Sequence, residues 1–80
     1  MSLDDAAILA GIREVAHNHL EWRGELAPEM RLVEDLELDS LKSLTLALEI
    51  ENRFRVYLDH EGEMITVGDL VAAIRSQLDG

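Results

Sequence analysis

The stretch LVEDLELDSL, at residues 32–41, decides the fold of this chain. Its acidic first part has little helical period, and a strongly apolar helical pattern begins where the stretch ends, at Asp39 and Ser40. Aspartate is a preferred N-cap residue, so the sequence predicts a helix over 40–53 with Asp39 as its cap. Ser40 is therefore expected at the exposed start of a helix.

The helix predicted over 40–53 carries two apolar stripes. At about 100° per residue, one stripe consists of Leu46, Ala47, Ile50 and Phe54, and the other of Leu41, Leu44 and Leu48. One stripe suffices to face a core, and an exposed second stripe marks an interaction site. The alternative is that both stripes are buried, because a small domain can surround a central helix.

The regions on either side predict two further main helices. The first covers 4–18, where apolar residues recur at helical spacing and Ser2 with Asp5 resembles a capping box. The last begins after Thr66, which forms a second capping-box pattern with Asp69. The buried side of this last helix is expected to hold Val67, Leu70, Val71, Ile74 and Leu78.

The two connections between the main helices are less regular. Residues 19–39 have poor periodicity and are expected to form mostly a long loop, pinned onto the helices by apolar side chains such as Trp22 and Val33. In the second connection, a brief helix over about 59–63 is favoured over a strand-like piece. The predicted fold is all-α: a small four-helix bundle of three main helices and one short helix, with a long loop between helices one and two.

Length and composition bound the class of protein. Eighty residues predict a single domain over 1–80. Seventeen acids against seven bases give a net charge of −10, which repels nucleic acid and anionic membranes and favours partners with basic patches, although solubility alone would also account for it. Cysteine is absent, and we recognise neither a signal peptide nor an apolar run of membrane length. We therefore expect a cytoplasmic monomer without membrane insertion.

The residues argue against a serine hydrolase. Such an enzyme needs a base, an orienting acid and an oxyanion hole around its serine. The Gly-x-Ser-x-Gly elbow is missing at Ser40, because Leu38 and Lys42 occupy the glycine positions. We expect no catalytic residue in this chain.

A metal site is not predicted either. The acidic run from Asp35 begins like a calcium-binding loop, but Ser40 and Leu46 stand where that loop needs glycine and glutamate. His17 and His19 are two positions apart, so on a helix they point in different directions. Two roles remain open for Ser40 from the residues alone. It could carry an anionic group, which the start of a helix favours, or it could only help Asp39 to cap the helix.

At this point a family resemblance becomes visible. The stretch at 32–41 resembles the attachment motif of acyl carrier proteins. The pattern over 44–54 resembles the second helix of that family, and residues 65–70 resemble the start of its last helix. The resemblance extends from about Met30 to the end of the chain, and the three blocks at matching spacing are far more specific than an isolated Asp-Ser-Leu step.

The resemblance implies a specific role for Ser40. A phosphopantetheinyl transferase would attach 4′-phosphopantetheine from coenzyme A to Ser40, with Asp39 and Leu41 beside the attachment point. The terminal thiol of that arm would carry an acyl group as a thioester, and the protein itself would catalyse nothing. The acyl-loading and acyl-processing enzymes would dock on the residues Leu41, Leu44, Thr45 and Leu48.

The chain also departs from the common fatty-acid pattern of the family. Lys42, Thr45, Asn52 and Arg53 stand where acids are frequent, and 55–58 lacks the usual Ile-Pro-type segment. Charge steering by this helix should be weaker as a result. The differences favour a specialised carrier within fatty-acid, polyketide or related biosynthesis. The alternatives are an aminoacyl or peptidyl carrier, and an unmodified helical interaction module of the same fold.

Overall fold

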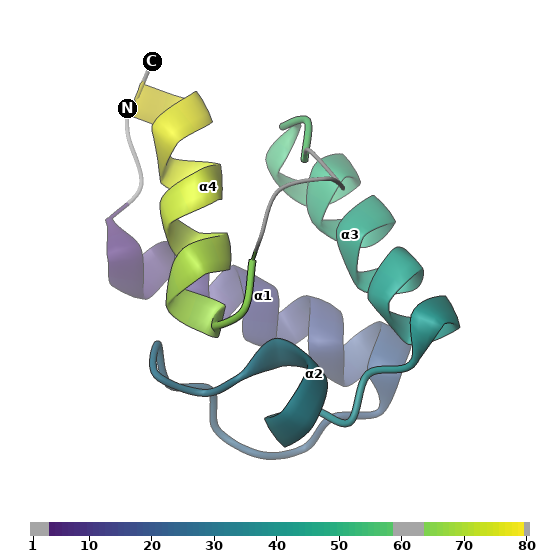
Figure 1. The fold of residues 1–80 in the computed structure, drawn as a ribbon. Helices are drawn as coiled ribbons and strands as arrows, with labels where there is room; N and C mark the ends of the chain where they lie inside the picture. The colour runs from purple at the N-terminus through teal and green to yellow at the C-terminus, as the bar shows by residue number, and fades with distance from the viewer. Residues whose placement is uncertain (1–3, 59–63, 80) are drawn as a thin grey trace.

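The computed structural model describes residues 4–58 and 64–79 of the chain. Its helices are α1 (Asp5–Leu20), α2 (Leu32–Asp35), α3 (Ser40–Phe54) and α4 (Val67–Asp79). Figure 1 shows α3 and α4 both packed on α1, with α2 in the connection that leads from α1 to α3. Over the described residues the fold is all-α, with an isolated bridge between Arg31 and Thr66 as its only β-type pairing. The predicted fold class is confirmed.

The first helix begins with a different cap from the one the sequence suggested. Asp4 is the N-cap of α1, and its Oδ1 accepts a hydrogen bond of 2.8 Å from the backbone N–H of Ala7. The pairing of Ser2 with Asp5 is therefore not the cap, and Ser2 itself lies outside the described residues. The helix continues to Leu20, slightly further than predicted.

The short helix of the bundle lies in the first connection. Residues 32–35, expected to be loop, form α2, and Asp35 Oδ2 accepts from the backbone N–H of Arg31 at 2.7 Å to close this turn. Arg31 also forms a 3.2 Å ion pair with Glu34. A single turn is too short to produce a helical period, which explains why the pattern did not predict it. The brief helix favoured over 59–63 lies outside the described residues.

The hydrophobic core draws on all of these segments. Its buried side chains are Ile8, Ile12, Val15, Leu26, Leu32, Leu36, Leu38, Leu46, Ile50, Val56, Leu58, Val67, Leu70, Val71 and Ile74. Burying one such side chain contributes about 1.5–3 kcal/mol. Four of these leucines lie in the connection between α1 and α3, so that segment is packed down by its own side chains. Trp22 packs against the core as predicted, but Val33 is 59% exposed and does not pin the connection.

The start of α4 is fixed by the predicted capping box. Thr66 Oγ1 accepts from the backbone N–H of Asp69 at 3.1 Å, and Asp69 Oδ2 accepts from the backbone N–H groups of Thr66 at 3.0 Å and Ile65 at 2.9 Å. The N–H of Thr66, and then that of Ile65, hold the pKa of the Asp69 carboxyl below its ordinary value. Backbone bonds of 2.8 Å then tie this end of α4 to the first connection: Leu32 N to Ile65 O, Val67 N to Met30 O and Gly68 N to Pro28 O.

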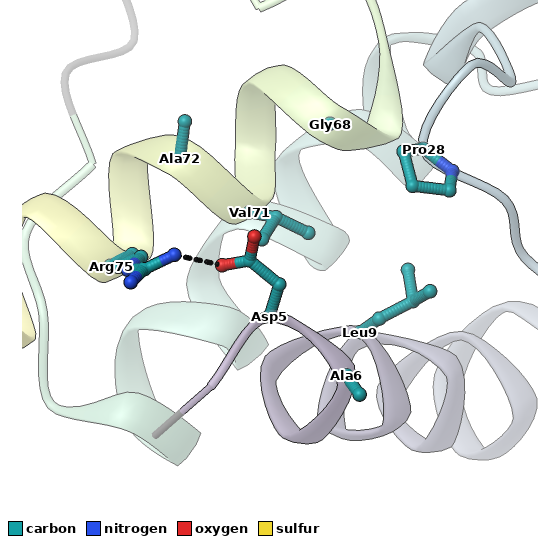
Figure 2. A pocket seen from close by; sticks show the side chains of 8 residues that line it. All are labelled: Asp5, Ala6, Leu9, Pro28, Gly68, Val71, Ala72 and Arg75. Atoms are coloured by element: carbon teal, nitrogen blue, oxygen red, sulfur yellow. Dashed lines mark hydrogen bonds and ion pairs between the residues drawn. The ribbon is translucent and has the colours of Figure 1, made fainter. Parts of the chain in front are cut away.

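Two long-range contacts hold α1 in place. Gly11 allows α3 to come close, since a Cβ on Gly11 would lie 2.5 Å from Cζ of Phe54. At the start of α1, Asp5 forms a 2.8 Å ion pair with Arg75 of α4 (Figure 2). Among the described residues, we find no helix with the length and apolar character needed to cross a membrane.

Candidate functional site

Ser40 is the first residue of α3, and it is exposed. The cap of the helix is Asp39, whose Oδ1 accepts from the backbone N–H of Lys42 at 2.7 Å. The carbonyl of Asp39 accepts from the N–H of Ser43 at 2.8 Å and starts the ladder of α3. Asp39 alone therefore makes the side-chain capping bond, and the Ser40 hydroxyl is not needed for it.

The backbone that leads into Ser40 is anchored on both sides of a tight turn. Leu36 and Leu38 are buried, and Glu37 between them adopts a left-handed conformation with φ 53°. The N–H of Leu38 donates to the carbonyl of Val33 at 3.1 Å, which closes the turn onto α2. The exposed Ser40 thus follows directly after a segment that is held in place by the buried side chains of Leu36 and Leu38.

The two apolar stripes of α3 differ in burial. Leu46 and Ile50 are 5% and 0% exposed, whereas Leu41 is 72%, Leu44 49% and Leu48 47% exposed. The alternative with both stripes buried is therefore wrong. Figure 1 shows why: α1 packs on one side of α3, and none of the helices that the structure describes covers the opposite side. Thr45, the fourth residue predicted to contact partners, is half-buried.

An apolar hollow of about 180 Å³ lies beside the start of α3. It is lined by Leu32, Val33, Leu38, Ser43, Leu46, Ala47, Leu58, Met64 and Leu70. These side chains come from α2, α3, α4 and the segments that flank α3. The sequence did not predict the hollow, because residues from so many segments meet only in the folded chain.

A larger groove lies elsewhere in the molecule, between α1 and α4 (Figure 2). Leu9, Val71 and Pro28 give it an apolar lining, and the Asp5–Arg75 ion pair stands at its side. None of its lining residues belongs to α2 or α3, so it is separate from the surroundings of Ser40.

Comparison with known proteins identifies the family. The meromycolate extension acyl carrier protein of Mycobacterium tuberculosis is 33% identical over 78 residues, which cover 94% of this chain and 68% of that protein. The acyl carrier protein of Streptococcus pneumoniae is 34% identical over 74 residues, which cover 89% of this chain and 96% of that protein. The chain belongs to the acyl carrier protein family. No protein-family model matches it.

The fold agrees with this membership. A solved structure of a candidate acyl carrier protein from Mycobacterium tuberculosis superposes with a TM-score of 0.81 at 26% identity, covering 89% of this chain and 99% of that one. The family resemblance of the sequence is thus confirmed. Acyl carrier proteins hold acyl groups for enzymes and are not themselves catalysts. Acyl carriage is the function that the relatives support for this chain.

Proposed function

We propose that Ser40 is the residue of this carrier to which 4′-phosphopantetheine is attached. In that step the Ser40 oxygen loses its proton and bonds to the phosphorus of the arm, and adenosine 3′,5′-bisphosphate leaves coenzyme A. The observation that carries the proposal is the exposed hydroxyl at the first position of α3, next to an Asp39 that already makes the capping bond. A phosphopantetheinyl transferase is the partner for this step.

The residues around Ser40 fit a phosphodiester. The first-turn N–H groups of a helix and the positive end of its dipole stabilise a negative charge at this place. Lys42 adds an exposed ammonium group in the same turn. The attached group supplies the thiol, which the chain cannot provide because it has no cysteine.

The rigid surroundings of Ser40 suit a tether. Leu36 and Leu38 fix the chain before the serine, and α3 fixes it afterwards. A flexible arm on a fixed base keeps the acyl group at a high local concentration near each enzyme that binds the carrier. We propose that these enzymes bind the exposed side of α3, at the residues Leu41, Leu44, Thr45 and Leu48.

We further propose that the cargo is an acyl chain of fatty-acid, polyketide or related biosynthesis. The apolar hollow of about 180 Å³ beside the start of α3 would accept hydrocarbon. The names of the relatives, one of them a protein of meromycolate extension, also favour acyl cargo over an aminoacyl or peptidyl group.

Intact-mass spectrometry tests the attachment site. The wild-type chain, incubated with coenzyme A and a broad-specificity phosphopantetheinyl transferase, should gain the mass of one arm. Ser40→Ala should gain nothing while keeping its helical circular dichroism. Ser43→Ala, a serine of the same helix, is the matched control and should be modified. If the wild-type chain gained no mass, the result would instead support the alternative of an unmodified helical interaction module with the same fold.

A second experiment tests the cargo. The holo protein is offered to an acyl-activating enzyme with a fatty acid, and separately to an amino-acid-adenylating enzyme with its amino acid. A thioester mass shift in the first reaction supports the proposal. A shift in the second reaction alone would favour the aminoacyl or peptidyl carrier.

A further inference from the structure

A pocket of about 360 Å³ lies on the exposed side of α1. The backbone N–H of Trp22 donates to the carbonyl of Ala16 at 3.1 Å, which folds the chain back against the end of α1. None of the lining residues belongs to α2, α3 or α4, so the pocket is separate from the surroundings of Ser40. We call it the polar pocket, and its lining consists of Ala10, Arg13, Glu14, His17, Trp22 and Arg23.

The acid that lines the polar pocket and the acid that contacts its rim are both paired with arginines. Glu14 Oε2 lies 3.0 Å from Nη2 of Arg53 on α3. Glu25 Oε1 lies 3.3 Å from Nη2 of Arg13. A further acid nearby in the sequence, Glu21, is exposed and is not part of the lining. The lining therefore holds two guanidinium groups against one carboxylate, in a chain that has seventeen acids and seven bases.

The polar pocket retains hydrogen-bond donors that the protein itself does not use. Arg23 and His17 are exposed, and neither forms a hydrogen bond or an ion pair within residues 4–58 and 64–79. Arg13 keeps further donors beside its contact with Glu25, because a guanidinium group has five N–H groups. The imidazole of His17 donates from at least one ring nitrogen in either protonation state. A ligand group that only accepts hydrogen bonds, such as an anionic oxygen, would match these donors.

Trp22 adds an aromatic surface to the polar pocket. Its side chain is half-buried and packs against the core. Its Nε1 is buried and has no hydrogen-bond acceptor among the described residues. A Cβ on Gly24 would lie 3.0 Å from Cζ2 of the ring and 3.6 Å from Nε1, so Gly24 covers that edge. A ligand in the polar pocket would therefore meet ring carbons, which suit a planar apolar group.

We propose that the polar pocket binds a small organic anion in which a phosphate is joined to a planar ring, as in a nucleoside monophosphate. The phosphate would accept hydrogen bonds from Arg23, Arg13 and His17, and the planar ring would lie against Trp22. The volume of about 360 Å³ is within the range of about 300–1,000 Å³ that is usual for small-molecule sites. The proposal does not depend on the role of Ser40, because the two sites share no residue.

The net charge of −10 opposes the binding of any anion from a distance, whereas the arginines of the polar pocket favour it on contact. At an ionic strength of about 0.1 M the Debye length is about 10 Å, so repulsion from acids beyond that distance is largely screened. Direct contacts with Arg13 and Arg23 are screened much less. We therefore expect binding at this ionic strength to depend on the side chains of the pocket and not on the total charge.

The experiment titrates the full chain with adenosine 5′-monophosphate and follows the fluorescence of Trp22, the single tryptophan of the chain. Excitation at wavelengths that adenine does not absorb keeps the signal specific to the indole. The emission should change to saturation. Adenosine and inorganic phosphate, titrated separately, should each bind at least about tenfold more weakly, because each offers only one of the two groups. Phosphate that binds as tightly as the nucleotide would overturn the proposal and leave an adventitious ion only.

Two charge-matched variants locate the site. Arg23→Gln should raise the Kd for adenosine 5′-monophosphate by at least about tenfold, since it removes charge-assisted hydrogen bonds to the phosphate. Arg55→Gln removes the same charge from an exposed arginine that follows α3 outside the pocket, and it should keep the wild-type Kd. Equal losses in both variants would overturn the proposal in favour of a general effect of charge. An emission that never changes with the nucleotide, or an Arg23→Gln variant that binds like wild type, would also overturn it.

Discussion

Asp39 and Lys42 are joined by a 2.7 Å hydrogen bond, in which the Asp39 carboxylate accepts from the backbone N–H of Lys42. The sequence left open whether Ser40 helps to cap α3, and this bond shows that the Asp39 side chain makes the cap. Asp39 caps the helix, and the exposed Ser40 beside it is available for modification. A substitution of Ser40 should therefore leave the capping bond of α3 in place.

Asp39→Ala is expected to destabilise the protein by about 1 kcal/mol, the usual loss when an N-cap side chain is removed. Asp39→Asn should retain most of the stability, because an amide oxygen can accept the same hydrogen bond. Urea denaturation measures both values. Ser40→Ala should be close to wild type in the same assay, and a larger loss for Ser40→Ala than for Asp39→Ala would contradict the assignment of the cap.

Gly11→Ala should destabilise the protein even though alanine is the better helix former by about 1 kcal/mol. The new methyl group would lie 2.5 Å from Cζ of Phe54, so α1 and α3 would have to move apart or Phe54 would have to leave its position. Overpacking of this kind costs about 1–3 kcal/mol. Thermal or urea unfolding measures the change.

The control for this steric cause is a double-mutant cycle. In a Phe54→Leu background the ring is gone, and Gly11→Ala should then cost less or become stabilising. An equal cost in both backgrounds would show that the ring of Phe54 is not what makes glycine necessary at this position.

Asp69 makes the free energy of unfolding depend on pH in the acidic range. Its pKa is lowered in the folded state by hydrogen bonds from the backbone N–H groups of Thr66 and Ile65, so the folded chain binds fewer protons there than the unfolded chain. The stabilisation from Asp69 is therefore complete above the ordinary pKa of 3.8 and is lost as the pH falls through the lower folded value. Asp69→Asn should be less stable than wild type at pH 7.

The difference between Asp69→Asn and wild type should shrink as the pH falls below about 4, when the wild-type carboxyl becomes protonated. Urea midpoints at neutral and acidic pH measure this difference. Glu29→Gln, at an exposed position, is the control and should show no comparable change. A difference that stays constant over the whole range would mean that the charge of Asp69 does not contribute to the capping box.

The sequence predicted those elements whose signals are local. The starts of α3 and α4 were predicted correctly because each depends on a capping residue, Asp39 or Thr66, directly before a helical pattern. Helical spacing separated the two apolar stripes of α3, and the structure decided that Leu41, Leu44 and Leu48 form the exposed one. α2 was missed because one turn gives no period, and Asp4 was passed over because Ser2 offered a competing capping pattern.

Contacts between distant residues could not be predicted from spacing. Asp5 and Arg75 lie 70 positions apart and meet only because α1 and α4 pack together. The exposure of Val33, the hollow beside α3 and the pairing of Glu49 with His19 depend on the folded arrangement in the same way. The sequence therefore predicted an exposed serine at the start of α3, and the structure added what surrounds it.

Leu44 and Leu46 provide the last prediction, because they lie two positions apart on α3 with opposite environments. Leu46 is 5% exposed and Leu44 is 49% exposed. Leu46→Ala should lower the free energy of unfolding by about 2–5 kcal/mol, since it removes buried methyl groups and leaves a cavity. Leu44→Ala should change it by no more than about 0.5 kcal/mol, as is usual for surface substitutions. Urea denaturation of the two variants under the same conditions measures the difference, and equal losses would mean that the exposed stripe of α3 is part of the core.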